Sequence, residues 1–341
     1  MQPFNPSAPF PDEEGSTLAT PERQKVGRKR RPRKLIVLSG PTATGKSRMA
    51  IELAQHLGGE IISADSVQVY RGMDVGTAKV TYDERLAAPH HLIDICDLSE
   101  PFNVSKYYDM ATQTIDAIFD RGGVPIVVGG TGFYIHALIY GPPMGPPSVP
   151  EVRKELEEQM EKFGHEALYD HLQKCDPLYA KTITPGDRNK IIRALEIIKL
   201  SKRPVSDFKL VSPSHSEKNY DFHCSFIHYP RETTYQRIEM RCDEMVAGGL
   251  IDEVKRLMKE GLEENSSAAQ AIGYRQVLDF IHSGEADFAG FVAAFKQASR
   301  RYAKRQFTWF RREPLFTWFD LEDLGYEAVI QQIIDEFESS L

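Results

Sequence analysis

The feature that most constrains this chain is an eight-residue segment, Gly40-Pro41-Thr42-Ala43-Thr44-Gly45-Lys46-Ser47, which fits the pattern G-x-x-x-x-G-K-[ST]. The β-branched apolar run of residues 35–39 before it predicts a buried parallel strand, and residues 47–57 after it predict a helix. In this context the glycines let backbone N–H groups turn toward phosphate oxygens, and the helix N-terminus adds its dipole. We therefore expect a phosphate-binding loop, with Lys46 as a point charge and the Ser47 hydroxyl as a ligand of Mg²⁺.

Strand and helix patterns alternate along the chain. Further strands are predicted at residues 60–63, 91–95, 125–128, 223–228 and 315–319, and an amphipathic helix between residues 103 and 122. Strands that alternate with helices form a parallel sheet with helices on both faces. The sequence therefore predicts an α/β fold, with a P-loop NTPase-like parallel sheet as its core.

Composition shifts divide the chain into segments. Five prolines fall within residues 141–150, and the helical patterns that follow contain no convincing strand. We expect a helical insertion at residues 143–205 within a core formed by residues 35–142 and 206–341. Residues 1–34 contain six prolines, and eight Lys or Arg with one acid lie between residues 22 and 34. This segment is predicted to be a disordered tail with a basic end, either solvated or serving as an accessory arm for a polyanion.

Charge and cysteine content limit the class of protein. The net charge of -7 argues against a general nucleic-acid coat but leaves room for a local basic surface. No stretch approaches the roughly 20 apolar residues of a membrane span. The four cysteines, at positions 96, 175, 224 and 242, form no C-x-x-C pair, which disfavours a zinc module and a disulfide scaffold. A cytoplasmic protein without a membrane segment is expected.

Polar residues follow two of the predicted strands at their carboxyl ends, which line the ligand crevice of a parallel sheet. Asp65 is therefore expected beside the phosphate loop, where it could bind a metal through water, accept a proton from a nucleophile, or cap a turn. Thr131 follows a second glycine-rich strand end, Gly129-Gly130. Its hydroxyl could contact substrate or cap the next helix.

The chain resembles the tRNA dimethylallyltransferases, also called tRNA isopentenyltransferases, from residue 35 to about residue 318. The phosphate loop alone is generic, but the ordered set of motifs is specific to that family. The remaining motifs of the set are Asp65-Ser66 with Tyr70, Gly76-Thr77-Ala78-Lys79, Pro89-His90-His91, Val128-Gly129-Gly130-Thr131, Gly273-Tyr274-Arg275-Gln276 and Arg305-Gln306-x-x-Trp309.

The resemblance implies a function. The loop would bind the diphosphate of dimethylallyl diphosphate rather than ATP, with Mg²⁺ as cofactor, and the dimethylallyl group would pass to the N6 amine of the adenosine 3′ of the anticodon. In that family the residue matching Asp65 accepts the proton, and the residue matching Thr131 contacts the reacting region. Arg241 matches the arginine on the diphosphate, but Arg237 lies one helical turn earlier and leaves this assignment open.

A basic helix is predicted near the end of the core. From residue 296 to residue 312 there are seven Lys or Arg and no acid, and they cover one half of a helix whose other half carries Phe291, Phe295, Ala298, Tyr302 and Trp309. We expect the aromatic half to pack on the core and the basic half to contact RNA phosphates. Together with the family segments and the basic residues of the insertion, the expected tRNA contacts are Asp65, Ser66, Val67, Gln68, Thr131, Arg153, Lys190, Arg193, Gln270, Gly273, Tyr274, Arg275, Arg300, Lys304 and Arg305.

Three alternatives stay open at this stage. The chain could transfer a prenyl group to free AMP, ADP or ATP, since the enzymes that do so share the core. It could be a small-molecule kinase that uses ATP on the same loop, or a non-catalytic RNA-binding protein. The one-sided basic helix favours a polynucleotide substrate, and Asp65 near Lys46 favours catalysis. A monomer is expected.

Overall fold

A computed structural model describes residues 33–143, 145–208 and 220–339. The expected tail at residues 1–34 lies almost entirely outside this range. The core is one sheet of six strands, β1 (Arg33–Ser39), β2 (Gly59–Ser63), β3 (His90–His91), β4 (Val124–Val128), β5 (Tyr220–His228) and β6 (Phe316–Asp320). Its order is β3-β2-β4-β1-β5-β6, and every neighbouring pair is parallel, which confirms the predicted α/β class.

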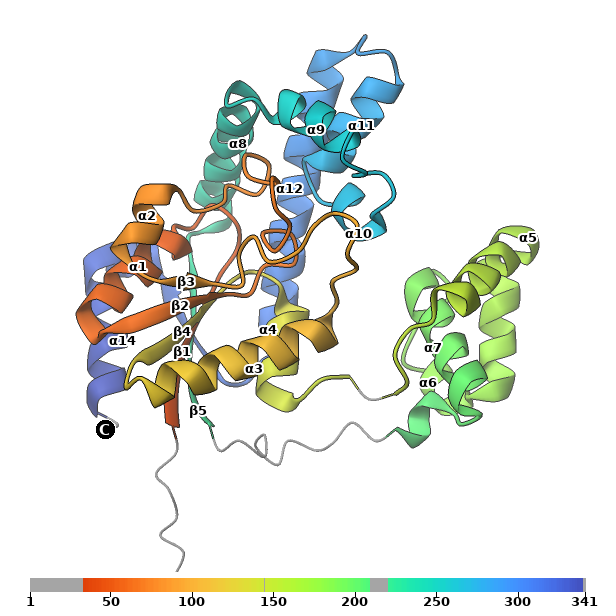
Figure 1. The fold of residues 1–341 in the computed structure, drawn as a ribbon, viewed down its shortest axis with the longest axis horizontal. Helices are drawn as coiled ribbons and strands as arrows, with labels where there is room; N and C mark the ends of the chain where they lie inside the picture. Colours follow the sequence, from red (N-terminus) through yellow and green to blue (C-terminus); the bar gives the residue numbers. More distant parts are fainter. Residues whose placement is uncertain (1–32, 144, 209–219, 340–341) are drawn as a thin grey trace, which may run out of the picture. The chain divides into compact units, whose positions relative to one another are not determined.

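Helices lie on both faces of the sheet (Figure 1), and successive residues of β1 show why it needs them. Leu35 and Val37 join one apolar cluster, and Ile36 and Leu38 join another, all four with 0% of their surface exposed. Strand side chains alternate between the faces, so an all-apolar strand must be covered twice. Helices α3 (Val104–Asp120) and α4 (Gly132–Tyr140) cover the first face, and α1 (Lys46–Leu57) and α14 (Tyr326–Ser339) cover the second.

A group of helices follows β5 and extends the first cluster. It consists of α8 (Arg231–Ala247), α9 (Leu250–Met258), α10 (Ser266–Ala269), α11 (Tyr274–His282) and α12 (Phe288–Phe310). The rings of Phe280 and Phe291 stack at 5.1 Å, and Phe291 lies 6.5 Å from Phe295, so α11 and α12 share an aromatic core. The predicted packing side of α12 is confirmed for Phe291 and Phe295, whereas Trp309 is 39% exposed. Two short helices, α2 (Tyr82–Ala87) and α13 (Leu321–Leu324), complete the core.

Most of residues 150–207 is helical, with α5 (Pro150–Cys175), α6 (Pro177–Ala180), α7 (Arg188–Ser201) and the 3₁₀ helix η1 (Val205–Asp207). They enclose an apolar cluster of their own that includes Leu156, Leu172 and Ile191. The buried carboxylate of Glu196 accepts hydrogen bonds from the Ser148 hydroxyl at 2.6 Å and the Val149 N–H at 2.7 Å, and so fixes the segment that leads into α5. The separate cluster supports the proposed division into a core and a helical insertion at residues 143–205.

The predicted strand at residues 91–95 is wrong beyond His91. Leu92 and Asp94 have positive φ angles of 61° and 56°, so the chain turns instead of extending. The Asp94 carboxylate accepts hydrogen bonds from Lys79 Nζ and Arg85 Nη2, both at 2.6 Å. These partners come from residues 15 and 9 positions away, and they stabilise a turn that the apolar pattern did not predict.

None of the described helices combines the length and the apolarity needed to cross a membrane.

Candidate active site at the carboxyl edge of the sheet

The loop between β1 and α1 presents unused backbone donors. The N–H groups of residues 43–48 have no acceptor among the described residues, although α1 begins within this stretch. A side chain at Gly40 would be impossible here, because a Cβ atom would lie 2.2 Å from the Ile227 carbonyl oxygen. Free N–H groups at a helix N-terminus form an anion site, and this geometry supports the predicted phosphate loop.

Lys46 is held inside this loop. Its ammonium group donates to the Pro41 carbonyl oxygen at 2.7 Å, and the Thr44 hydroxyl donates to the same oxygen at 2.8 Å. Burial and the nearby Arg241 lower the pKa of Lys46 to about 7, although Asp65 acts in the opposite direction. A bound diphosphate would restore the full charge of Lys46, because a nearby anion favours the protonated form.

Asp65 follows β2, and β4 separates β2 from β1, so Asp65 lies one strand further from the phosphate loop than the sequence suggested. Its Oδ1 atom accepts hydrogen bonds from the N–H groups of Val67 at 2.8 Å and Gln68 at 3.2 Å. One carboxylate oxygen therefore forms the turn that was considered as an alternative role. The other oxygen has no partner among the described residues, and it is the one available to a substrate.

Thr131 lies next to Asp65, where the ends of β2 and β4 meet. The Thr131 hydroxyl oxygen accepts a hydrogen bond from the Ser66 N–H at 3.1 Å, while its backbone N–H donates to the Ala64 carbonyl oxygen at 3.2 Å. The side chain makes no capping hydrogen bond to α4. The Thr131 hydroxyl was expected either to contact substrate or to cap α4. The structure does not show the cap, and the substrate contact stays a prediction.

Helix α12 crosses this edge of the sheet and joins its parts. Gln306 Oε1 accepts from the Thr42 N–H at 3.1 Å, and Gln306 Nε2 donates to the Gly130 carbonyl oxygen at 3.0 Å. The contact is so close that a Cβ atom on Gly130 would lie 2.1 Å from Gln306 Nε2. As a result, Tyr302 and Arg305, about one turn or less before Gln306, lie over the ends of the strands.

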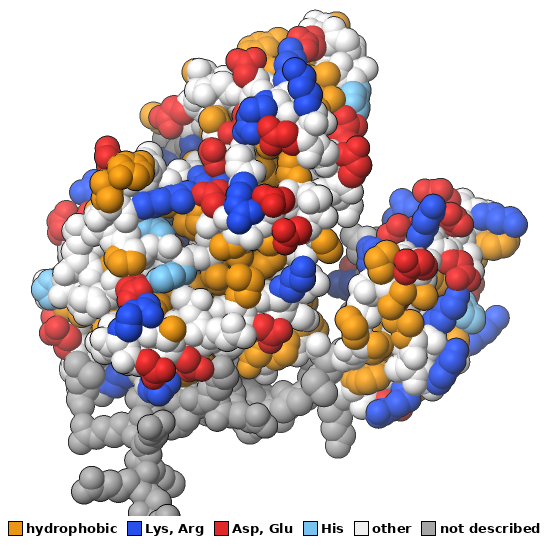
Figure 2. Space-filling model, viewed as in Figure 1, with side chains coloured by type: hydrophobic (Ala, Val, Ile, Leu, Met, Phe, Trp, Pro, Cys, Tyr) orange, Lys and Arg blue, Asp and Glu red, His pale blue; other side chains and the backbone are white. Residues whose placement is uncertain are grey.

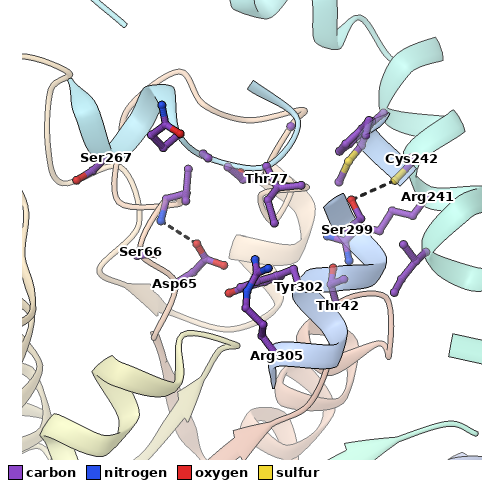
Figure 3. Close-up of a pocket in the computed structure, with 18 residues that line it drawn as sticks. Thr42, Asp65, Ser66, Thr77, Arg241, Cys242, Ser267, Ser299, Tyr302 and Arg305 are labelled. Carbon is purple, nitrogen blue, oxygen red and sulfur yellow. Dashed lines mark hydrogen bonds between the residues drawn. The ribbon is translucent and has the colours of Figure 1, made fainter. Parts of the chain in front are cut away.

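These elements enclose a cavity of about 310 Å³. In Figure 3, Asp65 and Ser66 approach from one side and Arg241 and Cys242 from α8 on the other, with Ser299, Tyr302 and Arg305 of α12 between them. Part of the wall is polar and includes Thr42 of the phosphate loop. The apolar part is formed by Val67, Ile238, Met245, Ala271, Ile272 and Phe295. The cavity therefore combines the Arg241 guanidinium, the Asp65 carboxylate and an apolar wall, and Thr42 connects it to the phosphate loop.

Arg241 and Arg237 differ in their surroundings. Arg241 lines the cavity, and its Nε atom is buried without a hydrogen-bond partner among the described residues. Burial lowers the pKa of Arg241, and Asp65 opposes this effect. Arg237 instead donates to the Ala43 carbonyl oxygen at 2.8 Å and lies 4.7 Å from the Tyr229 ring centroid. A guanidinium with a buried, unpartnered Nε atom is stabilised by a nearby anion, so the geometry favours Arg241 as the diphosphate ligand.

The Mg²⁺ prediction depends on Ser47, whose side chain lies exposed in the first turn of α1. No group of three or more His, Cys, Asp or Glu suited to a metal ion occurs in the described ranges. Mg²⁺ commonly uses one or two protein ligands and takes the rest from phosphate oxygens and water. A single exposed hydroxyl beside free loop N–H groups fits an ion that arrives with a diphosphate.

Gln68 lies behind the cavity wall, although it was expected among the tRNA contacts. Its Nε2 atom donates to the Thr77 carbonyl oxygen at 3.3 Å, and its Oε1 atom accepts from the Ser63 hydroxyl at 3.3 Å. Thr77, Ser66 and Val67 line the cavity, but Gln68 does not. Gln68 therefore contacts the backbone of Thr77, a residue of the cavity wall, and not the cavity itself.

The expected tRNA residues of the insertion are engaged in local ion pairs. Arg153 pairs with Glu157 at 2.9 Å, and Lys190 pairs with Asp187 at 3.2 Å. Arg193 pairs with the buried Glu196 at 2.7 Å and donates to the Pro146 carbonyl oxygen at 2.6 Å. Arg193 is thus tied to the structure of the insertion, whereas Arg153 and Lys190 have partly exposed partners that an RNA phosphate can replace.

The basic residues of α12 and of the turn after it fall into two sets. Lys296 pairs with Asp243 at 2.7 Å and Arg300 with Glu239, so these two cations are partly neutralised by α8. In the described ranges no carboxylate pairs with the other five, which are Arg301, Lys304, Arg305, Arg311 and Arg312. On the face drawn in Figure 2, acidic and basic side chains are interspersed. Three of these five cations, Arg301, Lys304 and Arg305, lie on α12, and the other two lie in the turn that follows it. They are candidates for RNA binding although the net charge of the chain is -7.

The segment of residues 270–275 contains both accessible and buried residues. Gln270 lines the cavity and Arg275 is exposed. Gly273 is buried, and Tyr274 is 0% exposed with its hydroxyl bonded to Glu253 Oε1 at 2.6 Å. The expectation that Tyr274 contacts tRNA is wrong for its side chain, because the ring is enclosed by protein.

Several residues of the site were not among the predicted ones. Tyr302 was expected only on the packing side of a helix. Gln306 and Thr77 were noted only as parts of family motifs. Met245 and Ile272 carry no sequence signal beyond hydrophobicity. The adjacent arginine and glutamine in Arg305-Gln306 are the one local indication that this helix meets polar backbone.

Comparisons with known proteins identify the family of the chain. A model of the family described as IPP transferase matches residues 68–313. A tRNA dimethylallyltransferase of Protochlamydia amoebophila (strain UWE25) is 54% identical over 308 residues, which cover 90% of this chain and 89% of the relative. One of Halalkalibacterium halodurans is 43% identical over 304 residues, covering 88% and 95%.

Solved structures are similar as well. The crystal structure of a full-length tRNA isopentenylpyrophosphate transferase from Bacillus halodurans is 42% identical, with a TM-score of 0.66, over 90% of this chain and 96% of that one. A eukaryotic dimethylallyltransferase acting on tRNA is 28% identical, with a TM-score of 0.76, over 90% and 80% of the two chains.

Proposed function

Because the chain belongs to the IPP transferase family, we infer that it transfers a dimethylallyl group from dimethylallyl diphosphate to the N6 amine of the adenosine 3′ of the anticodon in tRNA. The observation that carries this inference is the composition of one cavity. Thr42 of the phosphate loop and Arg241 lie at its polar wall, Asp65 faces the same space, and an apolar wall completes it. The apolar wall suits the hydrocarbon chain of a dimethylallyl group, and the Asp65 carboxylate suits a nucleophile that must lose a proton.

The leaving group is the centre of the chemistry. As the bond between C1 of the allyl group and the diphosphate oxygen breaks, its electrons pass to the diphosphate, and negative charge builds there. Donors already aimed at that charge stabilise the transition state, and this is commonly the largest catalytic contribution. We assign this role to the loop N–H groups, Lys46 and Arg241. Mg²⁺, held by Ser47 and phosphate oxygens, would supply further neutralisation when bound.

The adenine amine is a weak nucleophile, because its lone pair is delocalised into the ring, and it has to be activated. As the N6–C1 bond forms, the nitrogen must lose a proton. Asp65 is the group that we assign as acceptor, through the oxygen that is free of the local turn. Its other oxygen is fixed by two N–H groups, so the carboxylate is oriented before substrate arrives. Thr131 holds the adjacent Ser66 and so supports the same turn.

The adenosine has to leave the anticodon stack to reach this cavity. We propose that Arg301, Lys304 and Arg305 of α12, with Arg275, contact the tRNA backbone near the cavity, and that Arg153 and Lys190 contact the anticodon arm from the insertion. A cytoplasmic location and a monomeric state stay predictions.

The proposal is tested by nucleoside mass spectrometry. Unmodified tRNA is incubated with the protein, Mg²⁺ and dimethylallyl diphosphate, with parallel reactions that contain free AMP or only ATP. We expect a dimethylallyl mass gain on adenosine of the tRNA that is absent without the diphosphate. A gain on AMP alone would instead indicate the free-nucleotide reaction, and ATP consumption without transfer would indicate a kinase.

A further inference from the structure

Glu253 of α9 is a buried acid that the proposed reaction does not use. Only 8% of its surface is exposed, and no Lys, Arg or His of the described ranges forms an ion pair with it. It accepts four hydrogen bonds instead. Oε2 accepts from the N–H groups of Asp74 at 3.0 Å and Val75 at 2.7 Å, and Oε1 accepts from the Gly76 N–H at 3.1 Å and the Tyr274 hydroxyl at 2.6 Å. Four donors on two oxygens is the bonding pattern of a carboxylate.

The four donors come from two segments that both reach the cavity. Gly76 and Thr77 of the first segment line it, as do Gln270, Ala271 and Ile272, just before Tyr274, in the second. The two segments also touch directly, because a Cβ atom on Gly76 would lie 2.5 Å from the Tyr274 ring. Burial and the Glu253 carboxylate raise the pKa of Tyr274, which therefore keeps its proton and acts as a donor. Glu253 thus forms a brace between two segments that are far apart in sequence.

The brace continues toward Asp65. The Thr77 carbonyl oxygen, one residue beyond the braced N–H groups, accepts from Gln68 Nε2 at 3.3 Å. The Gln68 N–H donates to Asp65 Oδ1 at 3.2 Å. Gln68 therefore connects residues 74–77 to the turn that orients the Asp65 carboxylate. A displacement of residues 74–76 would be transmitted to that turn through the Gln68 side chain.

We propose that Glu253 is a positioning residue for prenyl transfer, which holds residues 74–77 and 270–274 at the separation that the two substrates require. This inference rests on the proposed function and adds a residue that touches neither substrate. It also gives Tyr274 a definite role, as the partner of Glu253 rather than of tRNA. A shift of about 1 Å in a positioned group can lower a reaction rate on the order of 100-fold, so a brace of this kind has a measurable effect.

The test compares Glu253→Gln, Tyr274→Phe and their combination. A glutamine offers one acceptor oxygen, so at most two of the four donors keep a partner, and its amide N–H₂ faces the other two. Phenylalanine removes one donor only. The matched control is Glu60→Gln. Glu60 is also a largely buried acid that accepts hydrogen bonds, but unlike Glu253 it has an ion-pair partner, Arg121 at 2.8 Å. It lies near the start of β2, at the opposite edge of the sheet from the cavity.

Two measurements are made on each full-length variant. The first is kcat and KM for both substrates. The second is amide hydrogen exchange, read at residues 74–76 and, as an internal reference, at β1 and β5. We expect Glu253→Gln to lower kcat by about 10- to 100-fold and to speed exchange at residues 74–76 by about 10-fold or more, with β1 and β5 unchanged. Tyr274→Phe should lower kcat about 3-fold, and the double variant should be no slower than Glu253→Gln, because the two side chains share one interaction.

Three results would overturn the proposal. The first is a Glu253→Gln protein with wild-type kcat. The second is unchanged exchange at residues 74–76. The third is faster exchange throughout the core, β1 and β5 included, which would make Glu253 a residue of general stability. Failure of the proposed function has a different signature, since wild-type protein would then transfer no dimethylallyl group. In that case exchange at residues 74–76, with and without inorganic diphosphate, still decides whether Glu253 braces the cavity.

Discussion

At the scale of single residues, the two oxygens of Asp65 have different tasks. Oδ1 accepts the N–H groups of Val67 and Gln68, and the second oxygen faces the cavity. The local turn and the proton transfer can therefore be separated by a substitution that keeps one acceptor oxygen and removes the base.

Asp65→Asn makes this separation. The amide oxygen can keep the two turn hydrogen bonds, but the side chain no longer accepts a proton. We expect kcat to fall by roughly 10²- to 10⁴-fold, with little change in the Kd for tRNA. Single-turnover kinetics and a filter-binding titration provide the two values. Near-normal kcat in the Asp65→Asn enzyme would remove Asp65 from the proton transfer.

Arg241 and Arg237 are four residues apart on α8 and offer a matched pair. Arg241 lines the cavity with its Nε atom unpartnered among the described residues, while Arg237 is bonded to the Ala43 carbonyl oxygen outside it. We expect Arg241→Gln to lower kcat by about 10²- to 10³-fold, as does the loss of a donor to developing charge. Arg237→Gln should cost about 10-fold or less. Equal losses in the two variants, measured by steady-state transfer to tRNA, would contradict the assignment.

At the scale of secondary-structure elements, α12 packs against the edge of the sheet on one side and is exposed to solvent on the other. Its buried side carries Gln306, which joins the phosphate loop to the end of β4, and its exposed side carries cations without carboxylate partners in the described ranges. One helix therefore fixes the cavity and presents charge to the polynucleotide next to it. The distribution of basic and aromatic residues around the helix predicted a buried side and an exposed side. It did not predict that the polar Gln306 would be buried against the phosphate loop.

The exposed side of α12 has a measurable signature. We expect Arg301→Gln with Lys304→Gln to weaken tRNA binding and to reduce the slope of log K against log salt by roughly 1 to 2. Arg121→Gln, which removes an exposed cation at the opposite edge of the sheet, is the control. An unchanged slope in the double variant would mean that this helix lies outside the RNA interface.

At the scale of the whole molecule, the cavity draws on segments from most of the core. Thr42, Thr77, Met245 and Arg305 all line it, and they belong to the phosphate loop, the loop before α2, α8 and α12. A ligand that binds only when these parts are assembled stabilises the assembled core as a unit.

Inorganic diphosphate with Mg²⁺ should therefore raise the midpoint of thermal unfolding. At 100 times its Kd the expected stabilisation is about 2.7 kcal/mol, which corresponds to roughly 5 °C for a protein of this size. Lys46→Met should abolish most of the shift at the same concentration. Differential scanning fluorimetry measures both proteins, and an equal shift in Lys46→Met would place the binding site elsewhere.

The sequence by itself determined the features of the fold that depend on residues close to one another in the chain. The strand, glycine loop and helix around residues 40–47 follow from local backbone preferences, and the apolar runs of β1 and β4 follow from burial on both faces. Parallel strands separated by helices then determine at which edge Asp65 and Thr131 lie. The ordered motifs gave the family, which the relatives bear out. The roles of individual site residues stay predictions.

Tertiary structure alone decided which side chains meet. Gln306 reaches Thr42 across 264 positions, and Glu253 reaches Gly76 across 177, so no local pattern could indicate either contact. The same holds for the choice between Arg241 and Arg237, for the burial of Tyr274 and for the turn at Asp94. Periodicity reports how one element divides between core and solvent. The partner of a polar side chain depends on how distant elements pack, because a buried donor or acceptor must find its counterpart wherever the fold brings one.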